Sequence, residues 1–165
     1  MIRTAAENDE KLLAGLIRVS FQDVARRFGL TQENCPKHPS NCSADWIHRD
    51  LSRGVQYYVL EADGKACGCA GLEQAPENVG YLERLAVLPH RRRQGYGARL
   101  VKRVAQDARR LDMTAISIGI IAQQTELVDW YRKMDFMLGE SKRFPHLPFT
   151  VAFMTLKLRE KPSQK

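Results

Sequence analysis

Apolar residues recur at helical spacing in several parts of the chain and predict its helices. The first set runs from Asn8, a residue type that caps helices well, to Gly29, a residue type that ends them, so one helix is expected over 8–28. Its apolar positions are Leu12, Leu13, Leu16, Ile17, Phe21, Val24 and Phe28. Further helices are expected over 43–53, 97–111 and 125–134.

Segments rich in β-branched and aromatic residues alternate with these helices and predict strands. The expected strands are 2–5, 56–62, 65–73, 81–87, 115–121, 136–144 and 149–158. Asp63-Gly64 is a two-residue hairpin turn, and Pro89 ends the fourth strand because proline lacks an amide donor. With no internal repeat and no linker, we expect one α+β domain over 1–165, with its core at about 1–158 and a flexible tail at 159–165.

The positive charge of the chain is concentrated in one segment. The formal net charge is +7, and residues 91–111 contain eight basic side chains and one acidic one, an excess equal to that of the whole chain. The basic residues are Arg91, Arg92, Arg93, Arg99, Lys102, Arg103, Arg109 and Arg110. Such a local positive field suits a polyanionic ligand, and it leaves cofactor phosphates and nucleic acid both open.

The N-terminal segment gives no sign of export or membrane insertion. Residues 1–10 are largely polar, so we expect no signal peptide, and no apolar run approaches the length that crosses a bilayer. The sequence therefore predicts a soluble, cytoplasmic protein.

The four cysteines are expected to be reduced thiols. A chain of 165 residues can be stable through its core alone, and Cys67 and Cys69 point to the same face of an expected strand. Cys35, His38 and Cys42 have zinc-type side chains, but a structural zinc site needs four ligands. We therefore expect no metal.

A glycine-rich turn joins the fourth strand to the basic helix. The amides that open a helix have no partner within it and carry partial positive charge, so they bind phosphate. Gly95 and Gly97 would let a pyrophosphate approach the backbone, while Arg92 and Arg93 add charge-assisted hydrogen bonds. These residues alone are also compatible with an alternative interpretation, an ordinary helix start with a solvated basic face. A P-loop is excluded, because no Gly-Lys-Ser/Thr follows.

The order of elements and two motifs resemble the GNAT superfamily of N-acetyltransferases. Leu85-Ala86-Val87 followed by Arg92-x-x-Gly95-x-Gly97 has the family's spacing, and Gln124, where asparagine is usual, stands seven positions before Tyr131. Asp135-Phe136 replaces the family's Gly-Phe, which indicates a tighter or differently shaped turn. The resemblance is most specific over residues 81–136. It implies a central, mixed, mostly antiparallel twisted sheet of about seven strands with helices on both faces.

The resemblance implies that acetyl-CoA binds where two neighbouring parallel strands, 81–87 and 115–121, splay apart. The pantetheine arm would pair with the backbone of Leu85, Ala86 and Val87, and the amide of Leu85 would face the thioester carbonyl. The other implied cofactor-binding residues are Arg92, Arg93, Gln94, Gly95, Tyr96, Gly97, Ala98 and Gln124. No metal is implied.

The implied reaction is direct attack of a primary amine on the thioester within a ternary complex. Tyr131 matches the family's acid for the leaving thiolate; the alternative is that it packs with Leu127 and only hydrogen-bonds the cofactor sulfur. Glu83 is the candidate base, on the strand face of Tyr81 and Leu85, and its alternative is a surface partner for an arginine. His146 and water are the other candidates for the base.

The acceptor is left open between a small-molecule amine and a protein amine. By position in the family fold, the loop 35–42 would shape the acceptor pocket. A homodimer stays open, and neither nucleic acid nor a membrane is expected as a partner. Two alternatives from other classes are an acyl-CoA-binding sensor without turnover and a basic nucleic-acid-binding module built on 90–93 and the helix that follows.

Overall fold

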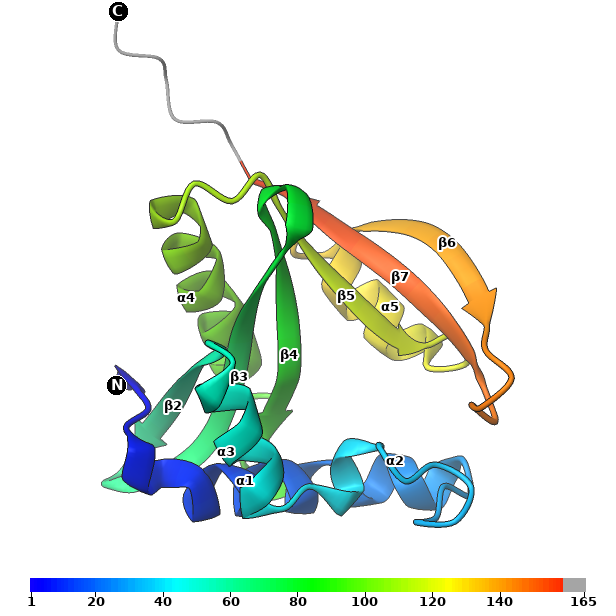
Figure 1. Ribbon diagram of the computed structural model, residues 1–165, viewed down its shortest axis with the longest axis horizontal. Coiled ribbons are helices and arrows are strands. Elements are labelled where there is room, and N and C mark those ends of the chain that lie inside the picture. Colours follow the sequence, from blue (N-terminus) through cyan, green and yellow to red (C-terminus); the bar gives the residue numbers. More distant parts are fainter. Residues whose placement is uncertain (159–165) are drawn as a thin grey trace, which may run out of the picture.

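The computed structural model describes residues 1–158, and the tail expected at 159–165 lies outside them. A seven-stranded sheet forms the centre of this part of the chain, in the order β1-β2-β3-β4-β5-β7-β6 (Figure 1). Its strands are β1 (Ile2–Thr4), β2 (Gln56–Ala62), β3 (Lys65–Ala75), β4 (Val79–Val87), β5 (Ala115–Ile121), β6 (Met137–Arg143) and β7 (Thr150–Lys157). Neighbouring strands are antiparallel except β4 and β5, which are parallel.

Helices cover both faces of the sheet. They are α1 (Glu10–Ser20), α2 (Gln22–Arg27), α3 (Ala44–Ser52), α4 (Tyr96–Arg110) and α5 (Thr125–Arg132). Residues of α1 and α3 share a core cluster with Tyr57, whereas residues of α4 and α5 share one with Tyr58, because successive residues of a strand point to opposite faces. The expected fold class is therefore confirmed. None of the helices within residues 1–158 is long and apolar enough to cross a membrane.

The single helix expected over 8–28 is wrong, because the chain breaks between α1 and α2. Phe21 has non-helical angles of φ −100° and ψ 1° at this point. The carbonyl of Ser20 would accept a bond from the Val24 amide in a continuous helix, but here it accepts one from the Arg92 guanidinium at 2.6 Å. A contact from a distant part of the chain thus replaces a helical bond.

The strands β4 and β5 pair along only part of their length. Val79–Tyr81 pairs with Ala115–Ser117, and beyond these residues the two strands are not paired in the described chain. In Figure 1 they diverge toward their carboxyl ends. The expected splay between these two parallel strands is present in the fold, and it opens the sheet at its middle.

β4 also carries a β-bulge just after the splay begins. Cys69 pairs with Ala86 and Gly71 with Glu83, so β4 has one more residue in this interval than β3. Arg84 lies within the bulge and has a positive φ of 48°. The bulge interrupts the strict alternation that was expected to place Glu83 on the face of Leu85.

Candidate active site

A cavity of about 1110 Å³ occupies the opening between β4 and β5. Its walls come from the α1–α2 junction, the loop that includes Lys37–Pro39, β4, the β4–α4 turn, β5, α5 and β7. Of the residues expected to bind cofactor or act in catalysis, those that line it are Glu83, Leu85, Ala86, Val87, Arg92, Arg93, Gly95, Tyr96, Gly97, Ala98, Gln124 and Tyr131. Gln94 does not line the cavity, although its backbone belongs to the same turn. The fold therefore gathers both sequence motifs around one space.

The start of α4 presents a series of unpaired backbone amides to this cavity. The turn passes through left-handed conformations at Arg93, with φ 62°, and at Gly95, with φ 82°. The amide of Arg99 bonds to the carbonyl of Gly95, and those of residues 93–98 have no acceptor within residues 1–158. Unpaired amides at a helix N-terminus are a binding site for phosphate.

Gly97 is required by a contact between two helices. A Cβ atom at this position would lie 3.0 Å from Cζ2 of Trp130 and 3.2 Å from its Cη2. The absence of a side chain therefore lets α4 approach α5, and the ring of Trp130 in turn packs edge-on against Tyr131, with 4.9 Å between ring centroids. The sequence had offered a different reason for this glycine, the approach of a phosphate.

The two arginines of the turn differ in their surroundings. The guanidinium of Arg92 donates to Asp23 and to the Ser20 carbonyl, each at 2.6 Å, so it ties the turn to the α1–α2 junction. Arg93 is exposed and has no charged or hydrogen-bonding partner in the described part of the chain. Of the two, Arg93 is the one that a phosphate can engage without breaking an existing ion pair.

Tyr131 is held by aromatic packing and lines the cavity. Its side chain is 5% exposed, and its ring packs edge-on against Phe136 at 5.1 Å between centroids as well as against Trp130. Burial raises the pKa of its phenol above the ordinary value, so the hydroxyl stays protonated. Within residues 1–158 this hydroxyl has no hydrogen-bond partner, which leaves its proton available to a bound molecule.

Asp135 closes α5 in the way that a glycine would. Its φ is 69°, in the left-handed region where glycine is unstrained and aspartate is tolerated. Its amide bonds to the Arg132 carbonyl at 3.0 Å, and the amide of Phe136 reaches the Tyr131 carbonyl at 3.2 Å. The aspartate thus adopts the left-handed conformation suited to the glycine that it replaces.

Glu83 lies in a half-buried cluster of charged side chains. Burial, together with hydrogen bonding to the Glu73 carboxyl group and repulsion from it, raises the pKa of Glu83 to about 7. Glu73 itself forms an ion pair with Arg53. The carboxyl group of Glu83 is therefore poised to exchange a proton near neutral pH, and it is not a freely solvated surface charge.

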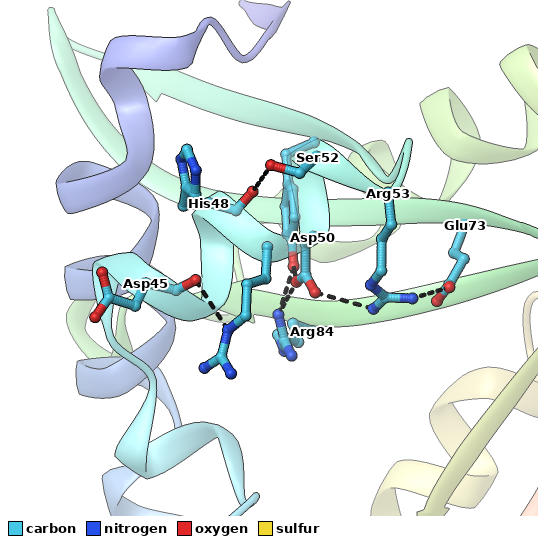
Figure 2. Close-up of polar contacts among 9 residues, drawn as sticks. Asp45, His48, Asp50, Ser52, Arg53, Glu73 and Arg84 are labelled. Carbon is cyan, nitrogen blue, oxygen red and sulfur yellow. Dashed lines mark hydrogen bonds and ion pairs between the residues drawn. The ribbon is translucent and has the colours of Figure 1, made fainter.

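Beside Glu83, a network of Asp50, Tyr57 and Arg84 joins α3, β2 and β4 (Figure 2). The hydroxyl of Tyr57 donates to Asp50 at 2.6 Å, and Nη1 of Arg84 donates to Asp50 and, at 2.8 Å, to the Tyr57 hydroxyl. Arg53 completes it with an ion pair to Asp50 at 2.9 Å. Sequence reasoning missed this network, because no local pattern marks residues that meet only through the sheet.

The other residues considered as a base or as metal ligands lie outside the charged cluster around Glu83. His146 is exposed in the β6–β7 connection and does not line the cavity. Cys35 and Cys42 are buried in separate core clusters, and burial lowers the pKa of His38 to about 4 while its Nδ1 lies 2.7 Å from Ser40 Oγ. No three metal-binding side chains converge anywhere in residues 1–158. The loop contributes Lys37, His38 and Pro39 to the cavity wall.

Comparison with known proteins agrees with this geometry. Residues 26–136 match the acetyltransferase (GNAT) family. The chain belongs to this family.

Similar proteins fall into two groups. The amino-acid acetyltransferases of Neisseria meningitidis serogroups A and B are each 29% identical over 104 residues, which is 62% of this chain and only 22% of theirs. Among solved structures, the ribosomal-protein-S18-alanine N-acetyltransferase of Escherichia coli has a TM-score of 0.78 at 14% identity, covering 100% of this chain and 97% of its own. The protein yncA from Salmonella typhimurium, solved with its cofactor acetyl-CoA, has a TM-score of 0.73 at 18% identity with the same coverage. These structural likenesses show the fold.

Proposed function

We propose that this protein is an N-acetyltransferase that moves an acetyl group from acetyl-CoA to a primary amine by direct attack in a ternary complex. The observation that carries the proposal is one cavity that combines the unpaired amides of 93–98 with the open edges of β4 and β5 and with Tyr131 and Glu83. The acetyl-CoA bound to a protein of the same fold supports the choice of donor.

In this proposal each part of the cofactor meets a different part of the cavity. The pyrophosphate lies against the amides of 93–98, and the pantetheine arm pairs with β4 at residues 85–87, whose edge toward β5 is open. The amide of Leu85 faces the thioester carbonyl and stabilises the developing oxyanion. Such a donor typically contributes about 3 kcal/mol to the transition state.

The proton movements follow from the two ionisable side chains. An amine attacks only when neutral, so Glu83 accepts the proton that the ammonium or the tetrahedral intermediate loses. The new N–C bond forms to give this intermediate, and the C–S bond breaks as the intermediate collapses. The thiolate leaving group takes the Tyr131 proton, which solvent then returns to the phenolate. Because burial raises the pKa of Tyr131, its hydroxyl is protonated in the free protein and can donate a hydrogen bond to the sulfur as negative charge develops there.

Acetyl-CoA is expected to raise the melting temperature, because a ligand that binds only the folded state stabilises it. At a hundredfold excess over Kd the gain is about 2.7 kcal/mol, or a shift of about 5–10 °C in a domain of this size. Differential scanning fluorimetry at millimolar acetyl-CoA measures it, and a panel of amines with thiol-release detection measures turnover. No shift would refute the proposal. A shift without turnover on any amine would favour the sensor, and a shift produced only by duplex DNA would favour the nucleic-acid reading.

Arg93→Ala is expected to weaken acetyl-CoA binding about tenfold and to reduce its dependence on salt, because one charge-assisted bond to phosphate is lost. Calorimetry at two salt concentrations measures both effects. Arg109→Ala, an exposed arginine at the far end of α4, is the matched control and should bind as wild type. Arg92→Ala should instead lower the melting temperature of the free protein, because its bonds to Asp23 and Ser20 disappear. Unchanged affinity in Arg93→Ala would remove this side chain from the phosphate site.

A further inference from the structure

The bulge in β4 places two consecutive charged side chains on the same side of the sheet. A Cβ atom on Gly71 would lie 3.0 Å from the Tyr57 ring and 3.2 Å from the Cβ of Glu83, so Glu83 and Tyr57 are neighbours. Arg84 Nη1 also reaches the hydroxyl of Tyr57. In a regular strand, residues 83 and 84 would point to opposite faces. Here an acid and a guanidinium stand side by side, and both line the cavity.

The guanidinium of Arg84 is fixed along one edge and free along the other. Nη1 holds Asp50 and Tyr57, and the carbon Cζ lies 5.4 Å from the centroid of the Trp46 ring. Nε and Nη2 have no acceptor among residues 1–158, and the side chain keeps 18% of its surface exposed. In Figure 2 the part of the Arg84 guanidinium that makes no bond points away from Asp50. A fixed guanidinium with an open edge binds a carboxylate through two parallel hydrogen bonds.

The ion pairs around Arg84 are compatible with a bound substrate carboxylate. Asp50 and Glu73 are matched by Arg53 and Arg84, which leaves Glu83 to exchange a proton with the acceptor amine. A carboxylate at the free edge of Arg84 would stand next to an amine at Glu83. Glu83 and Arg84 are consecutive residues that line the same cavity, and an α-amino acid carries its amino group and its carboxylate on one carbon atom.

We infer that the acceptor is an α-amino acid, whose carboxylate binds the free edge of Arg84 while its amino group faces Glu83. Arg84 is then a specificity-determining residue. The inference rests on the proposed N-acetyltransferase function and adds the substrate class. It separates free amino acids from two other kinds of acceptor, amines without a carboxylate and the N-terminal amine of a protein, where the nearest carboxyl group is an amide.

The test compares matched acceptors with the full-length protein and acetyl-CoA. L-phenylalanine, L-leucine and L-glutamate are each assayed beside the corresponding decarboxylated amine, the corresponding α-amide and a tripeptide that begins with alanine. We expect kcat/KM for at least one free amino acid to exceed that of its amine and its amide by about 100-fold, the value of two charge-assisted hydrogen bonds. Calorimetry of the same compounds with the CoA-bound protein measures the discrimination independently of turnover.

Arg84→Lys keeps the positive charge beside Asp50 but removes the two-donor edge. It should raise KM for the amino acid about 10- to 100-fold, a much larger change than in kcat or in the KM of the matched amine. The control is Arg103→Lys: Arg103, Asp107 and Tyr58 form a similar network on the opposite face of the sheet. It should leave all kinetic constants unchanged. If Arg84→Lys does not fold, the double variant Arg84→Gln, Asp50→Asn removes the charge pair together and should show the same loss.

Two results would overturn the inference and leave the proposed function standing. One is equal or better activity on the decarboxylated amines, the amides or the tripeptide, and the other is an unchanged amino-acid KM in Arg84→Lys. Failure of the proposed function looks different, because acetyl-CoA would then neither stabilise the protein nor be consumed with any acceptor. Turnover without amino-acid preference and absence of turnover are thus separate observations.

Discussion

Glu83→Gln is expected to lower kcat by about 10²- to 10⁴-fold, because the amide cannot accept the proton that the acceptor amine must lose. With the pKa of Glu83 at about 7, the wild-type kcat/KM should rise with pH through neutrality and then level off. The variant should lose this rise. Initial rates from pH 5.5 to 9 with a single amine, corrected for the fraction of neutral amine, measure both effects.

The same substitution should stabilise the protein at high pH. The pKa of Glu83 is raised in the folded state from an ordinary value of 4.5 to about 7, so the folded state holds a proton that the unfolded state has lost between these values. Stability from this group is therefore lost as pH rises from about 4.5 to 7. Glu83→Gln avoids this loss, so its free energy of unfolding at pH 8 should be about 1–3 kcal/mol larger than that of the wild type.

The matched variant for this prediction is Glu73→Gln. It leaves Glu83 in place but removes the charge that helps to raise the pKa of Glu83, so the rise in kcat/KM should move to lower pH without a loss of the plateau. If Glu83→Gln retains the wild-type kcat and the wild-type pH profile, Glu83 is not the base. Water or the acceptor itself would then take the proton.

Tyr131→Phe is expected to lower kcat by about 10- to 1000-fold while changing the affinity for acetyl-CoA little. A proton on the leaving thiolate acts only in the transition state, so its loss appears in kcat. The melting temperature should barely move, because the aromatic ring that packs against Trp130 and Phe136 remains and the hydroxyl has no partner within residues 1–158. Steady-state kinetics, calorimetry and thermal melting give the three quantities.

Tyr58→Phe is the control for this result. Tyr58 is also buried, but its hydroxyl donates to Asp107 at 2.8 Å on the α4 side of the sheet and does not line the cavity. Its loss should lower stability by about 1 kcal/mol, because one buried hydrogen bond disappears while Asp107 keeps its bonds to Arg103 and Arg110, and it should leave kcat unchanged. A Tyr131→Phe enzyme with unchanged kcat would reduce Tyr131 to a packing residue. Catalysis by proximity alone would then be the better description.

Much of the fold could be read from local patterns. The hairpin at Asp63-Gly64 and the end of β4 before Pro89 are each specified by a few consecutive residues, and the start of α4, expected at residue 97, lies at Tyr96. Turn chemistry and the 3.6-residue period act over such short distances, so the sequence alone was enough to predict them. The glycine motif and the seven-residue spacing from Gln124 to Tyr131 also indicated, through the family resemblance, residues that the structure places around one cavity.

What only the tertiary structure decided depends on contacts between distant residues. The break between α1 and α2 accompanies a bond from Arg92 to the Ser20 carbonyl, and that same bond withdraws Arg92 from the phosphate site. The bulge at Arg84 and the network of Asp50 and Tyr57 bring a guanidinium beside Glu83 and bury its carboxyl group. Desolvation and ion pairing depend on which side chains become neighbours in space. The pattern of residues along the chain does not show which distant residues the folded sheet will bring together.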